Sequence, residues 1–287
     1  MSQRVAVVTD SAASIPEALV RRWGIIVVPL DVIIDGEPKP EGPGMGTSRV
    51  LAALNAGSTV TTSQPTVGAF VDAYRAAAET GVKEIVSVHI SGGVSGTVNA
   101  AEVAAREAPI PVAIVDTRTV AMATGYSALA AAAFAKTGAA AGDVLAEARR
   151  VAQSSSLVFT VDTLEYLRRG GRVPRAVAAL GDALNIRPIL APVDGEIAMV
   201  ERVRSTARAR ERIVEMVEER LAGLSRPGLA IMGLGDPSDA DDAAILLESR
   251  HPELAMVVRT PVSAVLAVHG GPGAFAAAIA DLPPGFR

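Results

Sequence analysis

Short runs of β-type residues alternate with helical patterns along almost the whole chain, and this alternation limits the fold more than any other feature of the sequence. Arg4–Thr9, Glu84–His89 and Val112–Val115 each have the pattern of a buried strand, and segments of helical length separate them. Strands separated in this way indicate βαβ crossovers and a parallel sheet. The first part of the chain is therefore expected to form an α/β domain with helices flanking a mainly parallel sheet.

Caps, turns and periodicity predict the other elements of this part. Ile25–Ile34 is expected to be one further strand, and Ser14 is expected to cap a helix over Ile15–Trp23. Pro38–Gly46 and Thr59–Thr66 are expected to be loops, because prolines, glycines or hydroxyl residues dominate them. Further helices are expected over Ser48–Ala56, Val67–Glu79, Gly96–Ala108, Val120–Ala135 and Asp143–Ser154.

A hairpin signal changes the pattern in the second part of the chain. The pair Asp194-Gly195 lies between β-type runs over Arg187–Pro192 and Glu196–Val203, which is typical of a tight antiparallel turn. We therefore expect two α/β domains, residues 1–155 and 156–287, the second with helices on a mixed sheet. Its other elements are expected to be a strand over Leu157–Val161, a helix from its cap Ser205 to Leu221, and strand–helix–strand units to Val268.

Composition excludes several classes of function. The 287 residues include no cysteine, so a disulfide framework, a thiolate nucleophile and a zinc–thiolate site are excluded. A formal charge of -4 argues against a dedicated nucleic-acid-binding protein. The alanine-rich stretch Thr119–Ala135 suits a buried helix better than a bilayer span, and the first residues lack the apolar region of a secretory signal. The expected location is the cytoplasm.

Two polar segments are candidates for ligand binding. Thr59–Thr66 holds four threonines and one serine, and only Thr66 is explained as a helix cap. The other hydroxyls are neutral donors suited to an oxyanion. His89–Thr97 places glycines between a strand and a helix, where backbone N–H groups can meet an anion at Ser95–Thr97, although a tight turn explains the glycines equally well. The segment has neither dinucleotide-binding nor P-loop spacing.

Other polar residues have two interpretations each. His269 follows the apolar run Val265–Val268 and precedes glycines, so it is expected at the carboxyl end of a strand, where open α/β sheets bind ligands. The alternative is a core histidine bonded to a carbonyl. Asp10 is expected to cap the segment after the first strand, or to orient another side chain. The arginine-rich stretch Glu165–Arg212 is either a basic patch for phosphate or an acidic partner, or an exposed charged surface, which the arginine-rich composition favours.

Seven motifs, taken in order, resemble those of the DegV family of bacterial fatty-acid-binding proteins over nearly the whole chain. No single motif is decisive, but their order and spacing make the match specific. The resemblance implies two α/β domains with a long-chain fatty acid between them in an apolar tunnel. The motifs are Val8–Ser11, Thr62–Pro65, Ser91–Thr97, Val115–Thr117, Leu167–Val173, Val203–Arg204 and His269–Gly273.

The same resemblance implies roles for individual residues. Gly92 stands where many members have a serine, so Ser91, Ser95 or backbone N–H groups would replace that hydroxyl. Arg172 and Arg204 match arginines that are associated with the head-group region and with presenting the bound acid to a separate kinase. The residues implied to bind the carboxylate are Thr62, Ser63, Ser95, Gly96, Thr97 and His269.

The implied function is that of a lipid carrier without turnover of its own. It would bind an acid such as palmitate or oleate without a metal or cofactor, and present it to a fatty-acid kinase for acyl-phosphate formation in lipid metabolism. Burial of roughly 14 to 16 methylenes at about 0.8 kcal/mol each supplies most of the affinity. A monomer is expected, with no nucleic-acid partner, and transient contact with a membrane fits this role.

Two enzymatic alternatives stay open at this point. The first is a serine hydrolase or esterase that uses Ser95, His269 and Asp10 as nucleophile, base and orienting group. Against it, the segment Gly93–Thr97 lacks the final glycine of a G-x-S-x-G nucleophile elbow. The second is a subunit similar to dihydroxyacetone kinase, with substrate held covalently on a histidine, and it rests on fold-level analogy alone.

Overall fold

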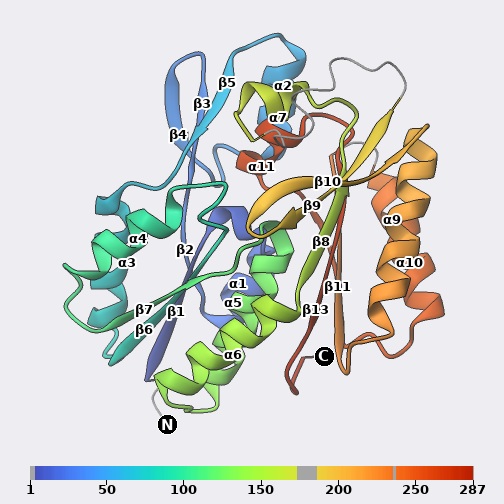
Figure 1. Ribbon diagram of the computed structural model, residues 1–287. Coiled ribbons are helices and arrows are strands. Elements are labelled where there is room, and N and C mark those ends of the chain that lie inside the picture. The colour runs from blue at the N-terminus through green and yellow to red at the C-terminus, as the bar shows by residue number, and fades with distance from the viewer. Residues whose placement is uncertain (1–3, 173–185, 235–236, 287) are drawn as a thin grey trace.

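The first half of the molecule is organised around a four-stranded parallel sheet with the order β2-β1-β6-β7. The computed structural model describes residues 4–172, 186–234 and 237–286 (Figure 1). The strands are β1 (Val5–Asp10), β2 (Ile26–Val28), β6 (Glu84–His89) and β7 (Val112–Asp116), and the short η1 (Ser11–Ala13) follows β1. All six residues of β1 are buried, as is typical of a parallel strand covered on both faces.

Helices cover both faces of this sheet, as the strand–helix alternation predicts. α3 and α4 pack on one face around Phe70 and Tyr74, and α5 and α6 pack on the other. Thr66 caps α3 through its hydroxyl, which confirms that prediction. The helices of this half are α1 (Glu17–Trp23), α3 (Val67–Glu79), α4 (Thr97–Ala105), α5 (Ala121–Lys136) and α6 (Ala141–Ser154).

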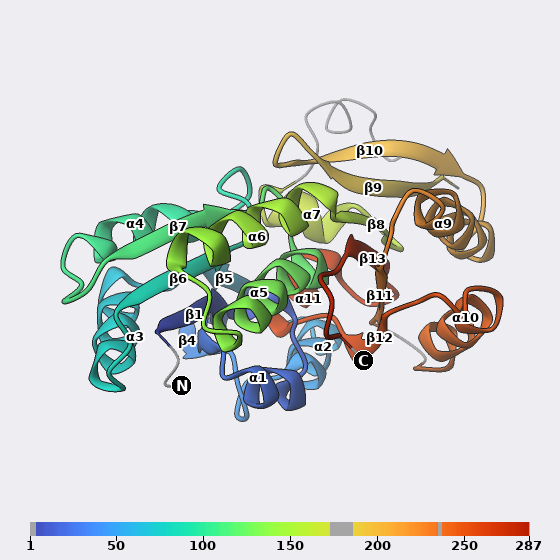
Figure 2. The same ribbon diagram turned by 90° about the horizontal axis from the view of Figure 1, so that it is seen from below.

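α5 lies between the two large sheets of the molecule (Figure 2). Nearly all of its 16 residues are buried, and most of them are alanine, glycine or serine. Small side chains let the neighbouring backbones approach closely: a Cβ atom at Gly125 would lie 2.8 Å from the carbonyl oxygen of Ala13. The apolar stretch is thus a buried helix, and no helix in the described part of the chain is long and apolar enough to cross a membrane.

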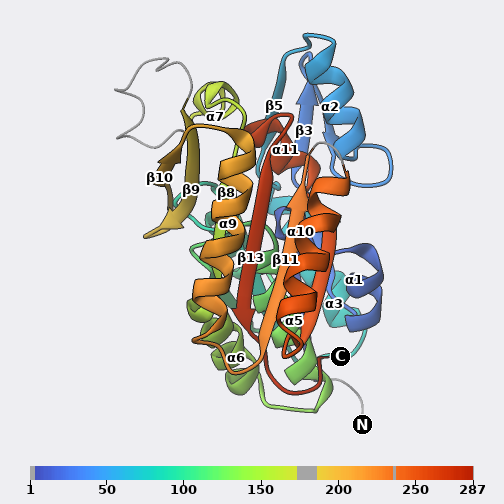
Figure 3. The ribbon, with the colours of Figure 1, turned by 90° about the vertical axis from the view of Figure 1, so that its right-hand side faces the viewer.

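The second half contains a six-stranded mixed sheet with the order β10-β9-β8-β13-β11-β12. Asp194 and Gly195, both with positive φ, form the turn of the β9–β10 hairpin, so the predicted hairpin is confirmed. Ser205 caps α9 as predicted, and α9 and α10 cover the outer face of the sheet (Figure 3). The elements are β8 (Ser156–Thr160), α7 (Glu165–Arg169), β9 (Arg187–Val193), β10 (Glu196–Val203), α9 (Thr206–Leu221), β11 (Pro227–Gly233), α10 (Pro237–Arg250), β12 (Met256–Pro261), α11 (Ala264–Gly270) and β13 (Phe275–Asp281).

A small antiparallel sheet, β4-β3-β5, lies beside α2 (Thr47–Asn55), and here several predictions were wrong. The single strand expected over Ile25–Ile34 is divided, because Pro29 and Leu30 carry the chain from β2 into β3 (Asp31–Ile34) of a different sheet. Both expected loops contain strands: β4 (Glu37–Pro40) and β5 (Val60–Ser63) pair with the two edges of β3. Proline is tolerated in β4 because it is an edge strand.

Three predictions near helix and strand ends also need correction. Val265–Val268 is part of helix α11, capped by the Ser263 hydroxyl, and not a strand. Ser14 adopts a left-handed conformation at the end of η1, and Pro16 precedes α1 without a side-chain cap. The strand β13 was missed because four of its seven residues are alanine, which has a low β propensity. The two-part α/β architecture is confirmed, whereas the domain boundary at residues 155 and 156 stays a prediction.

Candidate functional site

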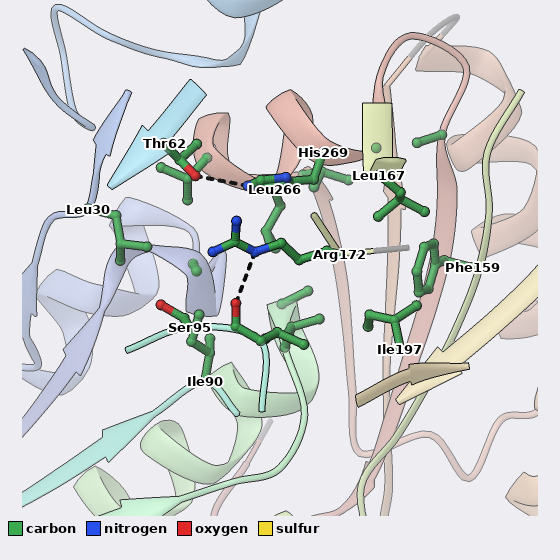
Figure 4. A pocket seen from close by; sticks show the side chains of 18 of the residues that line it. Leu30, Thr62, Ile90, Ser95, Phe159, Leu167, Arg172, Ile197, Leu266 and His269 are labelled. Atoms are coloured by element: carbon green, nitrogen blue, oxygen red, sulfur yellow. Dashed lines mark hydrogen bonds between the residues drawn. The ribbon is translucent and has the colours of Figure 1, made fainter. Parts of the chain in front are cut away.

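A cavity of about 130 Å³ is lined by residues from both halves of the molecule (Figure 4). One side of its wall comes from η1, β5, the turn after β6 and the start of α5, and the other comes from β8, β10, α7 and α11. A cavity of this volume can hold a chain of several non-hydrogen atoms. The apolar wall consists of Ala12, Leu30, Ile90, Val94, Val120, Ala121, Leu157, Phe159, Leu167, Ile197, Leu234, Val262, Val265, Leu266, Ala274 and Ala276.

The polar lining of the cavity begins at β5. Side chains alternate across a strand, and on β5 the side chain of Thr61 is exposed whereas that of Thr62 lines the cavity. The Thr62 hydroxyl Oγ1 lies 2.8 Å from Nε2 of His269 in the last turn of α11. This hydrogen bond joins the small sheet to α11, between residues 207 positions apart in the sequence.

His269 is held as a neutral imidazole. Burial, and secondly the charge of Arg172, lower the pKa of its imidazole to about 4 from the usual 6.5. Its Nδ1 atom is buried and has no hydrogen-bond partner among the described residues. Gly170 is required beside it, since a Cβ atom there would lie 2.2 Å from Nδ1. At neutral pH the ring therefore acts as one donor and one acceptor, and Nε2 can donate to Thr62.

Ser95 approaches the same space from the turn that precedes α4. Its hydroxyl lies 2.8 Å from that of Thr97 and accepts from the Thr97 backbone N–H at 3.3 Å. Figure 4 places Ser95 across the cavity from Thr62 and His269. Gln64 lies over the turn, because a Cβ atom at Gly96 would come within 1.9 Å of its amide oxygen.

Arg172 extends into the space between these polar side chains (Figure 4). Its Nε donates to the carbonyl oxygen of Val94 at 3.1 Å, and its Nη1 donates to the carbonyl oxygen of Gly170. A guanidinium group in this position can pair with a carboxylate or phosphate through two parallel hydrogen bonds. The site thus combines one cation with neutral donors.

Not every residue named from sequence lines the cavity. Thr62, Ser63, Ser95, Arg172 and His269 do, whereas Gly96, Thr97 and Arg204 are outside the lining. Thr97 is fully buried and supports Ser95, and Arg204 is exposed between the end of β10 and α9. Ser63 donates to the carbonyl oxygen of Gln64. Val173, the last residue of the Leu167–Val173 motif, lies outside the described residues.

The turn after β6 has a structural role that its glycines explain. Ser91 donates to the carbonyl oxygen of Gly195 at 2.6 Å, so the β9–β10 hairpin is bound to the first half. A Cβ atom at Gly93 would lie 2.5 Å from the same oxygen. Gly92 does not line the cavity, and its N–H donates to Asp116. A serine at position 92 would thus attach its side chain to a backbone position outside the cavity lining.

The geometry does not form a Ser–His–Asp triad. Asp10 caps η1 by accepting from the N–H of Ala12, as expected, and also lies 3.0 Å from Nδ1 of His89. His269 contacts Thr62 and not Ser95. Asp10 and His89 are both fully buried, and Nε2 of His89 lies 2.7 Å from the Ser87 hydroxyl. Asp10 therefore orients His89 within the core of the first half.

Sequence reasoning missed Gln64 as a cavity residue, although it lies within the Thr62–Pro65 motif. It also missed the role of His89. The signal in the sequence was that His89, like Asp10, is a polar residue at the end of a buried strand. In the described part of the chain, no group of three or more His, Asp or Glu side chains is placed to hold a metal ion.

The fold and the site define a two-part α/β binding protein, in which an apolar cavity carries a cluster of hydroxyls, an imidazole and a guanidinium group. The sequence profile of the DegV family, described as "Uncharacterised protein, DegV family", matches residues 4–281. The chain belongs to the DegV family.

Similar proteins cover almost the full length of the chain. A DegV domain-containing protein of Streptomyces coelicolor is 42% identical over 95% of this chain and 97% of its own length. A solved structure described as fatty acid binding of a DegV family protein from Thermus thermophilus has a TM-score of 0.90 at 32% identity, covering 97% of this chain and 100% of its own. DegV of Bacillus subtilis, described as a fatty acid binding protein, has a TM-score of 0.90 at 29% identity, covering 98% of this chain and 100% of its own.

Proposed function

We propose that this protein binds a long-chain fatty acid, with the carboxylate among Thr62, Ser95, His269 and Arg172 and the acyl chain along the apolar wall. The observation that carries the proposal is the composition of the cavity, whose lining is apolar apart from this group and the neighbouring Ser63 and Gln64. A ligand that fits such a lining has one anionic end and a long apolar body. The fatty acids named for the solved Thermus thermophilus and Bacillus subtilis proteins are ligands of this kind.

These four polar side chains suit a carboxylate because the hydrogen bond that Thr62 accepts leaves its own hydroxyl free to donate. Neutral His269 donates from Nε2 to the Thr62 oxygen, which leaves the Thr62 hydroxyl hydrogen free to donate to the ligand. Ser95 donates from the opposite side, and Arg172 supplies the compensating charge. Hydrogen bonds to a charged group are worth about 1.5–3 kcal/mol each. The apolar tail adds about 0.8 kcal/mol for each buried methylene.

Native mass spectrometry of the purified protein, with lipid analysis of the denatured extract, tests this proposal. We expect a bound species of fatty-acid mass that is lost in a Ser95→Ala/His269→Ala double variant. Ser48→Ala/His251→Ala is the matched control, because both of its side chains lie outside the cavity. Wild-type protein that is empty and also fails to bind added palmitate or oleate would contradict the proposal.

We further propose that the bound acid is presented to a separate fatty-acid kinase, which forms the acyl-phosphate while this protein performs no turnover. The exposure of Arg172 at the cavity and of Arg204 beyond β10 supports a partner surface. Arg204→Ala is the sharper variant, because Arg204 is outside the cavity lining. We expect it to reduce kinase-dependent phosphorylation while lipid retention stays unchanged. Unchanged phosphorylation in both Arg204→Ala and Arg172→Ala would contradict this role.

A further inference from the structure

A second cavity, of about 430 Å³, lies on the other side of Leu157, a residue that lines both cavities. The β7–α5 connection forms one of its walls, and Arg149 and Gln153 of α6 line another. The starting residues of β8 and the end of β9 complete it, together with Arg220 of α9. The proposed fatty-acid site uses none of its polar residues.

The lining of this second cavity is cationic. It contains Arg118, Arg149 and Arg220 against one acidic residue, Asp116. Arg118 donates to the carbonyl oxygen of Asp194 at 2.6 Å and lies 3.5 Å from the carboxylate of that residue, so its charge is partly compensated.

Arg149 and Arg220 differ from Arg118 in that no acidic side chain in the described part of the chain compensates their charge. Within residues 4–172, 186–234 and 237–286, neither has a carboxylate partner or another hydrogen-bond acceptor. The neighbouring Arg150 pairs with Glu147, and Arg212 on α9 pairs with Glu201 and Glu219. Both side chains are exposed, so the cavity carries two uncompensated positive charges that a ligand can reach from solvent.

A buried hydroxyl adds an independent observation. Thr119 also lines this cavity, is only 5% exposed, and its Oγ1 has no hydrogen-bond partner among the described residues. Its position is fixed, because its carbonyl oxygen accepts from the N–H of Ser91 at 2.8 Å. A buried hydroxyl without a partner is destabilising, and an oxygen acceptor on a ligand would remove that cost.

We infer that this cavity binds a phosphate-bearing anion, with the phosphate at Arg149, Arg220 and Thr119. Guanidinium groups match phosphate oxygens in charge and in the spacing of their donors. Leu157, Val158 and Pro192 provide apolar surface for an organic body attached to the phosphate. The ligand is either a small soluble organic phosphate or the head group of an anionic phospholipid, which share this chemistry.

Two probes, used with the full-length protein, distinguish a soluble phosphate from a phospholipid head group. Calorimetric titration with inorganic pyrophosphate at low ionic strength tests the soluble anion. Co-sedimentation with phosphatidylglycerol vesicles, compared with vesicles of phosphatidylcholine alone, tests the head group. We expect saturable binding of at least one probe and a loss of tenfold or more in affinity in Arg149→Gln/Arg220→Gln. The control Arg75→Gln/Arg106→Gln removes two exposed arginines, one on α3 and one directly after α4, that are outside the lining of this cavity, and it should bind as the wild type does.

A third variant separates binding from folding. Thr119→Val removes the unpartnered hydroxyl, so its melting temperature should equal or exceed that of the wild type while affinity for the probe falls. Binding of neither probe, or equal affinity in the two double variants, would overturn the inference. Because Arg149, Arg220 and Thr119 do not line the first cavity, the outcome is independent of fatty-acid binding.

Discussion

At the scale of single residues, Thr62 and Thr61 form a matched pair on one strand. Thr62→Val removes the hydroxyl that bonds to His269 and is proposed to donate to the carboxylate, whereas Thr61→Val changes an exposed neighbour on the other face of β5. Losing one hydrogen bond to a carboxylate costs about 1.5 kcal/mol or more, a factor of about ten in affinity. We expect this loss for Thr62→Val alone, measured by displacement of a fluorescent fatty acid, and equal losses would contradict the assignment.

The ionisation of His269 gives a second prediction at this scale. Its pKa falls from 6.5 to about 4 on folding, so the folded state binds fewer protons than the unfolded chain between these values. The associated stability is present above pH 6.5 and is lost as the pH falls toward 4. The imidazole signals in an NMR titration should therefore stay those of the neutral ring from pH 8 to 5. Arg172→Gln should raise the pKa by removing a repelling charge, and a wild-type midpoint near 6.5 would contradict this account.

At the scale of elements, Glu41 connects the small sheet to the helix that carries His269. It follows β4, and its carboxylate accepts from the N–H of Ala264 at the start of α11. Burial raises the pKa of this carboxyl from 4.5 to about 7, despite hydrogen bonds from Ser11, Ala264 and Val265 that lower it. The folded state thus binds more protons between pH 4.5 and 7, and stability falls as the pH rises through this window.

Glu41→Gln should remove this pH dependence. The wild type loses stability as the pH rises and the variant does not. The difference in the free energy of unfolding between variant and wild type should therefore shift by about 2–3 kcal/mol in favour of the variant from pH 4.5 to pH 8. Urea denaturation at several pH values measures the difference, with Glu37→Gln on β4 as the control for loss of an exposed carboxyl. A constant difference between Glu41→Gln and the wild type across this range would show that Glu41 does not titrate there.

The elements also show what the sequence can predict. Strands and helices with clear periodicity, such as β6 and α3, were predicted at their observed bounds. β5 was missed because its threonines read as a polar loop, although they alternate between an exposed and a cavity-facing side chain. A short apolar run such as Val265–Val268 fits a strand or a buried helix equally well. His269 was nevertheless predicted, because the family motif identifies the residue independently of its secondary structure, and it does line the cavity.

At the scale of the whole molecule, the cavity depends on contacts between halves that no local pattern encodes. Thr62 and His269, or Arg172 and Val94, meet only after the two sheets have packed around α5. Sequence periodicity describes one element at a time and cannot supply these distances. The residue types of the site could therefore be predicted from motifs, whereas the position of Arg172 between the polar side chains and the second cavity could be found only in the folded structure.

The contact between the β9–β10 hairpin and the first half can be tested at Gly93. An alanine there would place its Cβ atom 2.5 Å from the backbone oxygen of Gly195, so the hairpin must shift and the hydrogen bond from Ser91 must weaken. We expect a loss of about 1–3 kcal/mol in the free energy of unfolding. Gly44→Ala is the control, since no atom lies within 4 Å of a Cβ atom at that position.

Gly93→Ala should affect binding as well as stability. Ile197 of the shifted hairpin and Ser95 of the turn both line the first cavity, so a change in their spacing should lower fatty-acid occupancy. Urea denaturation and native mass spectrometry of the same samples measure the two effects together. If Gly93→Ala matched Gly44→Ala in both, the hairpin contact would not hold the halves together. A loss of stability with full occupancy would instead mean that the cavity forms independently of the hairpin.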